Sequence, residues 1–256
     1  MKSLELFKLQ NRRALVTGST RGLGFTLARG LADAGAEIIL NSANSENLEN
    51  AADRLRQEGA IVHTLCFDVT QIDQVTTAID HFEAEIGAID ILVNNAGMQH
   101  RAPLESFPVD RFDDMMRLNI NGAFYVGQTI AKHMIPRREG KIINICSAQT
   151  ALARPSIAPY TASKGAIANL TKGMTCDWAK YGLQINGLAP GYFKTELTSS
   201  LVADEAFSTW LCTKTPAGRW GEVKELVGAC IFLASPASSF VNGHILYVDG
   251  GITVSL

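Results

Sequence analysis

Short apolar runs rich in valine and isoleucine alternate with longer amphipathic stretches along almost the whole chain. The runs show no polar alternation, which is typical of strands that helices cover on both faces of a parallel sheet. Strands and helices that alternate in this way form right-handed βαβ units within a doubly wound sheet. The predicted strands cover residues 14–17, 38–40, 61–67, 89–93, 141–146, 183–188 and 245–248, and the clearest helices cover 46–58, 71–86 and 160–180.

The chain organisation indicates one α/β domain across residues 1–256, because no linker, low-complexity segment or internal repeat interrupts it. The segment 194–220 departs from the alternation and combines a predicted helix at 205–212 with a turn at 215–218. It follows the sixth predicted strand, and open α/β sheets bind ligands outside the carboxyl ends of their strands, so we expect a substrate lid. A packed surface excursion is the alternative interpretation.

The charge pattern excludes two classes of partner. The chain has 23 basic and 25 acidic side chains, a net charge of −2 and no block of like charge, so neither nucleic acid nor a membrane surface is expected. Neither a signal-peptide stretch nor a run of 18 apolar residues is found, which favours the cytoplasm. The five cysteines are far apart and the five histidines scattered, so no disulfide framework and no metal site are expected.

A glycine triplet follows the first predicted strand and opens a helix. Gly18 permits a tight turn, Gly22 lets backbone N–H groups approach a pyrophosphate, and Gly24 lets the helix pack closely. The spacing is GxxxGxG, which differs from the GxGxxG fingerprint, but its setting in a βαβ unit favours dinucleotide binding over a structural turn.

The second predicted strand indicates which dinucleotide is bound. It ends near Asn41 without the carboxylate that would hold a ribose 2′-hydroxyl, and Arg21 in the glycine loop is suited to a 2′-phosphate. NADP(H) is therefore favoured, with NAD(H) possible in principle. The alternative role for Arg21 is a solvated helix start.

Three polar residues near the fifth strand have the composition of an acid–base site. Ser147 ends that strand, and Tyr160 and Lys164 lie four residues apart, on one face of a helix. A nearby ammonium favours the phenolate, and a serine hydroxyl can hold a substrate oxygen within reach of the phenol. Taken singly, each of these residues has a structural explanation, Ser147 for example as a cap at the strand end.

Taken together, the ordered motifs resemble the classical short-chain dehydrogenase/reductase family over nearly the full chain. The motifs are Gly18-Ser-Thr-Arg-Gly-Leu-Gly24, Asp68-Val69, Asn94-Asn-Ala-Gly97, Asn119, Ser147, Tyr160-x3-Lys164 and Pro190-Gly191. The resemblance implies a Rossmann fold with seven parallel strands and a homotetramer built through the long helices.

The resemblance also implies a role for each site residue. Tyr160 would be the acid/base, Lys164 would bind ribose and assist Tyr160, and Asn119 would hold a water in a proton relay, although Asn119 has an alternative role as a helix-kink residue. Asp68 and Val69 would lie at the adenine, and Gly191 and Thr195 beside the nicotinamide. The remaining cofactor residues implied are Gly18, Thr20, Arg21, Gly22, Leu23, Gly24, Ser42, Asn95, Ala96, Gly97, Tyr160, Lys164 and Pro190.

The loops that flank the motifs are similar to those of family members that act on a sugar acid. The implied reaction interconverts D-gluconate and 5-dehydro-D-gluconate. Arg101 can present a planar fork to the carboxylate, and Gln149 and Tyr192 can serve the hydroxyls, with Ser147 and Tyr160 at the reacting oxygen. For Arg101 the alternative is an ordinary surface arginine.

Two other functions stay open at the level of the sequence. One is a different carbonyl reductase, acting on 3-oxoacyl carriers or on a keto-deoxy sugar acid, because substrate loops diverge within one fold. The other is a nucleotide-sensing protein without turnover, which the presence of both Tyr160 and Lys164 disfavours.

Overall fold

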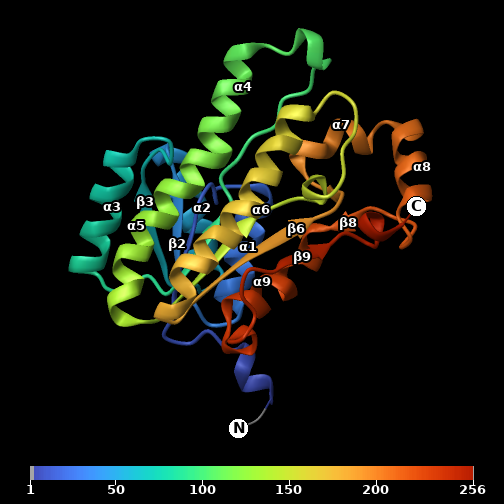
Figure 1. Cartoon of the computed structure of the whole chain (residues 1–256). Helices are drawn as coiled ribbons and strands as arrows, with labels where there is room; N and C mark the ends of the chain where they lie inside the picture. Colours follow the sequence, from blue (N-terminus) through green and yellow to red (C-terminus); the bar gives the residue numbers. More distant parts are fainter. Residues whose placement is uncertain (1–2, 256) are drawn as a thin grey trace.

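The central element of the computed structural model, which describes residues 3–255, is a parallel seven-stranded sheet (Figure 1). The strand order is β3-β2-β1-β4-β5-β6-β9, so the order reverses between β1 and β4. Open α/β sheets bind ligands at such a reversal. The strands are β1 (Arg13–Val16), β2 (Glu37–Ser42), β3 (Val62–Cys66), β4 (Ile91–Asn94), β5 (Gly140–Ile145), β6 (Leu183–Pro190) and β9 (Ile245–Val248).

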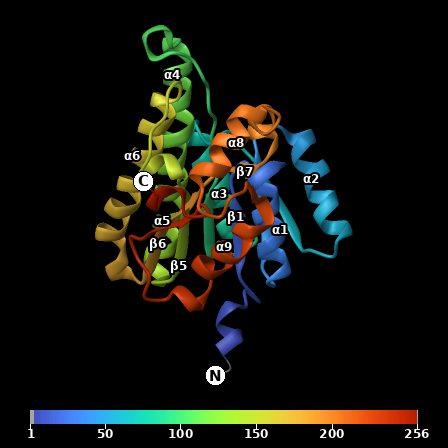
Figure 2. The ribbon, with the colours of Figure 1, turned by 90° about the vertical axis from the view of Figure 1, so that its right-hand side faces the viewer.

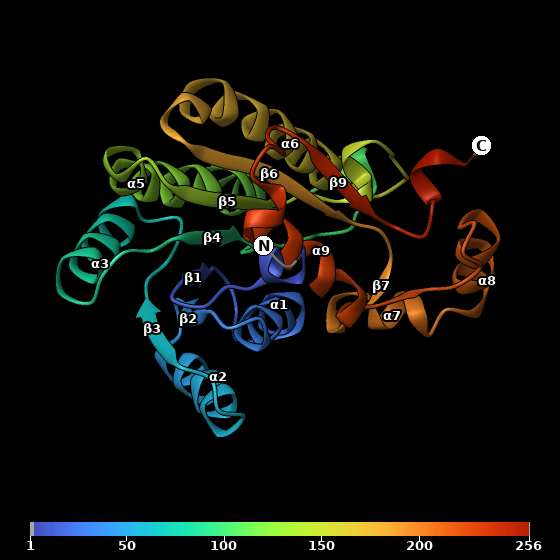
Figure 3. The same ribbon diagram turned by 90° about the horizontal axis from the view of Figure 1, so that it is seen from below.

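Helices cover both faces of the sheet, as the continuous apolar runs predict (Figure 3). One face packs against α1 (Gly22–Asp33), α2 (Ser45–Gln57) and α9 (Val227–Ala234), and the other packs against α3 (Ile72–Glu85), α5 (Gly122–Arg137) and α6 (Ala158–Trp178). Strand side chains alternate between the two cores. Leu15 and Val16, for example, are both fully buried but belong to opposite faces. The Rossmann architecture predicted from the sequence is confirmed.

The helical region before α5 contains a wider turn. The chain passes from α4 (Val109–Met116) through a π-helical turn at Arg117–Asn121 directly into α5. Single π turns inside helices frequently lie at functional sites. Here the turn contains Asn119, whose side chain is buried.

The segment predicted as a lid lies at the end of the molecule away from the N-terminus (Figure 2) and packs against Ala148 and Ile252. Two short parallel strands, β7 (Phe193–Lys194) and β8 (Gly221–Glu222), pair with each other at the two ends of this segment. Between them lie α7 (Ser199–Val202) and α8 (Glu205–Lys214). Trp220 is buried and its indole N–H donates to the Ser208 hydroxyl at 3.1 Å, so aromatic packing and one hydrogen bond connect α8 to β8.

Candidate active site

A cavity of about 700 Å³ opens at the carboxyl ends of β1, β4, β5 and β6, where the strand order reverses. Loops that follow these strands supply most of its wall. The sequence-predicted residues that line it are Gly18, Thr20, Arg21, Gly22, Leu23, Gly24, Asn95, Ala96, Gly97, Arg101, Ser147, Gln149, Tyr160, Lys164, Pro190, Gly191, Tyr192 and Thr195. Residues predicted to bind the nucleotide and residues predicted to bind the substrate therefore line the same cavity, although they are far apart in the sequence.

The glycine loop has the backbone geometry that a phosphate cradle requires. Gly18 and Gly22 have φ values of +60° and +56°, which favour glycine, and no atom lies within 4 Å of the position a Cβ would take at Gly22. Helix α1 begins at Gly22 and no side chain caps its first amides. Free amides and the helix dipole attract anions, so this end fits a dinucleotide pyrophosphate.

Asn95 and Thr17 hold the glycine loop against the end of β4. The Asn95 side-chain amide donates to the carbonyls of Thr17 and Gly18 at 2.9 and 3.0 Å. The Thr17 hydroxyl accepts from the backbone N–H groups of Asn95 and Ala96, both at 3.0 Å. A Cβ at Gly24 would clash with the Asn95 side chain and would lie 2.5 Å from the Gly18 carbonyl oxygen, so only glycine fits this contact.

Some residues expected at the cofactor do not line the cavity, namely Ser42, Asp68 and Val69. The Ser42 hydroxyl accepts from the backbone N–H of Asn44 at 3.1 Å, and the Asp68 carboxylate accepts from that of Thr70 at 2.9 Å. Val69 is buried against α5, where a Cβ at Gly122 would lie 2.8 Å from its side chain. Their nucleotide contacts stay a prediction.

Arg21 lies at the mouth of the cavity and is highly exposed. Its Nε is 3.9 Å from a carboxylate oxygen of Glu196, which comes from the segment after β7. Both side chains are more than three quarters exposed, so this ion pair contributes little to stability. Arg21 is therefore free to exchange Glu196 for a phosphate.

Helix α6 presents both Tyr160 and Lys164 to the cavity, as the four-residue spacing predicts. The Lys164 side chain is buried, and its ammonium donates to the Ile145 carbonyl at the end of β5 at 2.7 Å. The ammonium nitrogen also lies 5.7 Å from the centre of the Tyr160 ring. One hydrogen bond to the sheet thus fixes a cation beside the phenol and leaves two N–H groups for a ligand.

Ser147 lines the cavity and also caps the turn that follows β5. Its hydroxyl oxygen accepts from the backbone N–H of Gln149 at 3.1 Å and caps the short turn Ala148–Thr150. Because that bond uses the oxygen as acceptor, the hydroxyl proton remains available to a substrate oxygen. The neighbouring Cys146 also lines the cavity, but burial raises the pKa of its thiol to about 11, so it stays neutral.

The Asn119 side chain does not line the cavity, and its amide is engaged within the protein. Its Oδ1 accepts from the Met98 backbone N–H at 2.8 Å, and its Nδ2 donates to the Met98 carbonyl and the Ser163 hydroxyl, both at 3.0 Å. Asn119 therefore connects the loop after β4 to α6 through hydrogen bonds. A part in a water relay would need backbone groups of the π-helical turn or a rearranged side chain.

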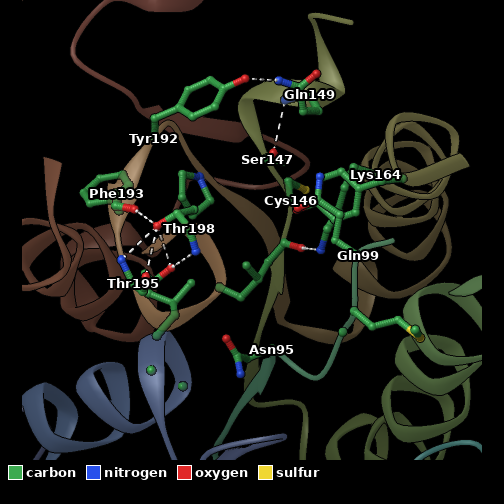
Figure 4. Close-up of a pocket in the computed structure, with 18 of the residues that line it drawn as sticks. Asn95, Gln99, Cys146, Ser147, Gln149, Lys164, Tyr192, Phe193, Thr195 and Thr198 are labelled. Atoms are coloured by element: carbon green, nitrogen blue, oxygen red, sulfur yellow. Dashed lines mark hydrogen bonds between the residues drawn. The ribbon is translucent and has the colours of Figure 1, made fainter. Parts of the chain in front are cut away.

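The far end of the cavity carries the expected substrate side chains. Figure 4 shows Tyr192 and Gln149 at one end of the site and Asn95 at the other, with Ser147 and Lys164 between them. The Gln149 amide donates to the Tyr192 hydroxyl at 3.2 Å, whereas the Gln149 Oε1 is buried without a partner among residues 3–255. Burial raises the pKa of Tyr192 and the charge of Arg154 opposes that effect, so this end of the cavity is both desolvated and cationic.

Arg154 lines the same cavity and was not predicted from the sequence. It lies in the loop between the Ser147 turn and α6, and its guanidinium carbon is 5.5 Å from the centre of the Phe207 ring on α8. The only sequence signal was an arginine within a loop between two site residues. Gln99 and Thr198 also line the cavity without having been predicted.

The structure reveals neither a metal centre nor a membrane span in the part of the chain it describes. Among residues 3–255, no three side chains of histidine, cysteine, aspartate or glutamate are grouped to hold a metal ion. None of the helices in this range combines the length and apolar character that crossing a membrane requires.

Known proteins resemble this chain over 98–100% of its length. Gluconate 5-dehydrogenase of Gluconobacter oxydans (strain 621H) is 60% identical over 256 residues, covering 100% of both chains. The 5-keto-D-gluconate 5-reductase of Escherichia coli (strain K12) is 50% identical, covering 98% of this chain and 99% of its own. A gluconate 5-dehydrogenase from Burkholderia cenocepacia J2315, solved in complex with NADP and tartrate, superposes with a TM-score of 0.97 at 61% identity, covering 99% of this chain and 100% of its own.

The family profile described as short chain dehydrogenase matches residues 12–206, which include the glycine loop, Ser147, Tyr160 and Lys164. This range spans more than half of the chain, and the strand order and the cavity agree with it. The chain belongs to the short-chain dehydrogenase family.

Proposed function

We propose that the protein is an NADP(H)-dependent oxidoreductase that interconverts D-gluconate and 5-dehydro-D-gluconate. The observation that carries the proposal is the convergence of Ser147, Tyr160 and Lys164 with an uncapped helix N-terminus in one cavity. The substrate follows from relatives that are 50–60% identical over the full length and are named for gluconate or its 5-keto form. The phosphorylated cofactor follows from the NADP in the Burkholderia structure and from Arg21 here.

The residues around the glycine loop fit a dinucleotide. The amides at the start of α1 would hold the pyrophosphate, and Lys164 has N–H groups to spare for a ribose hydroxyl. When bound, NADP(H) accepts or delivers the hydride at its nicotinamide ring. The other groups proposed to contact it are Thr20, Leu23, Ser42, Asp68, Val69, Asn95, Ala96, Gly97, Pro190, Gly191 and Thr195.

Tyr160 would exchange the proton that accompanies the hydride. During oxidation its phenolate takes the proton from the substrate hydroxyl, and during reduction its phenol returns it to the carbonyl oxygen. The Lys164 ammonium would stabilise the negative charge of the phenolate, and the Ser147 O–H group would donate a hydrogen bond to the substrate oxygen. Asn119 would position the loop after β4 that borders this centre.

The substrate end of the cavity suits a polyhydroxy acid better than an acyl chain. Arg101 lines the cavity and would bind the carboxylate, while Gln149 and Tyr192 would bind hydroxyls. The 3-oxo group and thioester of an acyl chain carry no negative charge to pair with the partly buried Arg101 guanidinium. The segment 194–220 would act as a lid, since Thr195, Glu196 and Thr198 line the same cavity.

The proposal is tested by the initial rate of NADPH oxidation with 5-dehydro-D-gluconate, repeated with NADH and with acetoacetyl thioester. We expect turnover with the sugar acid and a clear preference for NADPH. Faster turnover of the thioester would assign the carbonyl-carrier reductase function instead. Tight NADPH binding without turnover of any carbonyl would assign the nucleotide-sensing function.

Arg21→Ala should raise KM for NADPH about tenfold and leave KM for NADH unchanged. A charge-assisted hydrogen bond contributes about 1.5–3 kcal/mol, and the high exposure of Arg21 places the effect at the low end. Steady-state kinetics with both cofactors measure the difference. Equal changes for the two would mean that Arg21 does not read the 2′-phosphate.

We also propose a cytoplasmic homotetramer. All five cysteines are free, as in a reducing compartment, and Val109, Phe112 and Phe124 on α4 and α5 are exposed apolar side chains suited to subunit contacts. Light scattering coupled to size exclusion measures the mass in solution; a monomer would contradict the assembly.

A further inference from the structure

The loop between the Ser147 turn and α6 places a second cation at the substrate end of the cavity. Arg154 and Arg101 both line this cavity and both are partly buried. The Nε atoms of both arginines are fully buried and have no hydrogen-bond partner among residues 3–255. Buried polar groups of native proteins almost always have partners, so two such atoms in one cavity point to a ligand.

Among residues 3–255, no carboxylate supplies a counter-charge for these two arginines. No carboxylate of the described chain lies within 4.0 Å of either guanidinium, and Glu196, the one acidic side chain among the described lining residues, is instead near Arg21. Burial lowers the pKa of Arg101, and the charge of Arg154 lowers it further, so the two cations repel each other. Uncompensated cations in a desolvated site are costly, and a bound anion removes that cost.

The chemistry of the anion follows from the donors. A guanidinium presents its N–H groups in a plane that matches a carboxylate. The phosphates of a dinucleotide have their own cradle at the α1 amides, at the other end of the cavity. Gln149 and Tyr192, beside the arginines, supply a neutral acceptor and hydroxyl group. A small hydroxy acid satisfies this set, whereas a neutral sugar leaves both guanidiniums without a counter-charge.

The lid fixes the orientation of Arg154. Its guanidinium stacks at 5.5 Å over Phe207 of α8, and Phe207 in turn lies 5.9 Å from Tyr192 and 6.2 Å from Trp220 between ring centres. A cation over an aromatic face is held electrostatically while its N–H edge stays free. Contact with α8 thus orients Arg154 toward the cavity from the loop before α6, whereas Arg101 comes from the loop after β4.

We infer that Arg154 is a specificity-determining residue that shares the substrate carboxylate with Arg101 and makes an acidic substrate mandatory. The inference rests on the proposed function for the identity of the substrate but extends it to a residue not assigned there. It predicts discrimination against neutral ketoses that Arg101 alone would not provide.

The experiment compares Arg154→Gln with the unaltered protein on a matched pair of ketones. 5-Dehydro-D-gluconate and L-sorbose share their carbon chain, and the carboxylate of the first is a CH₂OH group in the second. We expect Arg154→Gln to lower kcat/KM for the acid about tenfold to a hundredfold, mainly through KM, because one charged hydrogen-bond set is lost. For L-sorbose the change should be at most about twofold. Arg154→Lys keeps the charge but not the planar set of N–H groups, so its kcat/KM for the acid should lie between those of Arg154→Gln and the unaltered protein.

Controls separate this inference from folding and from the proposed function. Arg29→Gln, on the exposed part of α1 and paired with Glu58 at 2.8 Å, removes an arginine outside the cavity and should leave both ketones unchanged. Binding of tartrate and of neutral threitol to the complex with NADP⁺, followed by the fluorescence of Trp210 and Trp220, needs no turnover. We expect tartrate alone to bind, and Arg154→Gln to weaken it about tenfold or more.

The results distinguish the role of Arg154 from the identity of the substrate. Equal losses for the acid and the ketose, or tartrate binding that Arg154→Gln leaves unchanged, would overturn the role of Arg154. An unaltered protein that fails to reduce 5-dehydro-D-gluconate, yet binds tartrate through Arg154, would overturn the proposed substrate and retain the carboxylate site.

Discussion

Tyr160→Phe should lower kcat for 5-dehydro-D-gluconate reduction by about a thousandfold or more. General acid–base catalysis contributes roughly 10²–10⁴-fold, and the variant lacks the only phenolic oxygen on this face of α6. The ring remains, so its packing near Lys164 and the binding of NADPH should change little. Single-turnover kinetics measure the loss at the hydride step, and titration of NADPH fluorescence measures binding.

The chain offers a matched control for this substitution. Tyr181 lies outside the cavity, and the Lys180 ammonium is 5.2 Å from the centre of its ring, which repeats the lysine–tyrosine contact of the site. Tyr181→Phe should leave kcat unchanged. If Tyr160→Phe also retained full turnover, the proton would have to come from another group and the proposed mechanism would be wrong.

Lys164→Met should lower kcat about a hundredfold and also weaken NADP(H) binding. The variant keeps the length of the side chain but removes the cation that stabilises the phenolate and the N–H groups proposed for the ribose. It also leaves the Ile145 carbonyl without its donor, at a cost of about 1–3 kcal/mol in the free energy of unfolding. Single-turnover kinetics and titration of NADPH fluorescence measure the two effects.

Thermal unfolding separates the chemical effect of Lys164→Met from its structural effect. Lys180→Met, which removes the exposed counterpart beside Tyr181, should leave kcat unchanged. A loss of rate that disappears at saturating NADPH would restrict Lys164 to cofactor binding.

The layered fold could be predicted because burial on both faces leaves a direct record in the sequence. Runs such as residues 141–146 and 183–188 correspond to β5 and β6, with ends that differ by at most two residues. Ile61 looked like part of the third strand but is 61% exposed, and β3 begins at Val62. The β7–β8 pair was beyond prediction, because its two residues per strand come from segments that only the fold brings together.

The site was predictable where local geometry determines it. The four-residue spacing of Tyr160 and Lys164 and the glycines of the first loop give their positions without long-range information. The engagement of the Asn119 amide with Met98 and Ser163 depends on three separate segments, and so does the contact of Arg154 with Phe207. Such contacts leave no periodic signal in a single sequence.

Helix α6 is joined to the sheet by a buried hydrogen bond from Asn144 to Thr171 at 2.9 Å and a partly buried one from Thr175 to the Ile185 carbonyl at 3.0 Å. Tyr160 and Lys164 therefore stand on a part of the molecule anchored to two strands, whereas Arg101, Arg154 and Tyr192 stand on loops. Exchange of those loops between relatives should transfer the choice of acid or neutral ketone and preserve the catalytic step. The same anchoring lets new substrates evolve through the loops while the reaction itself is inherited intact.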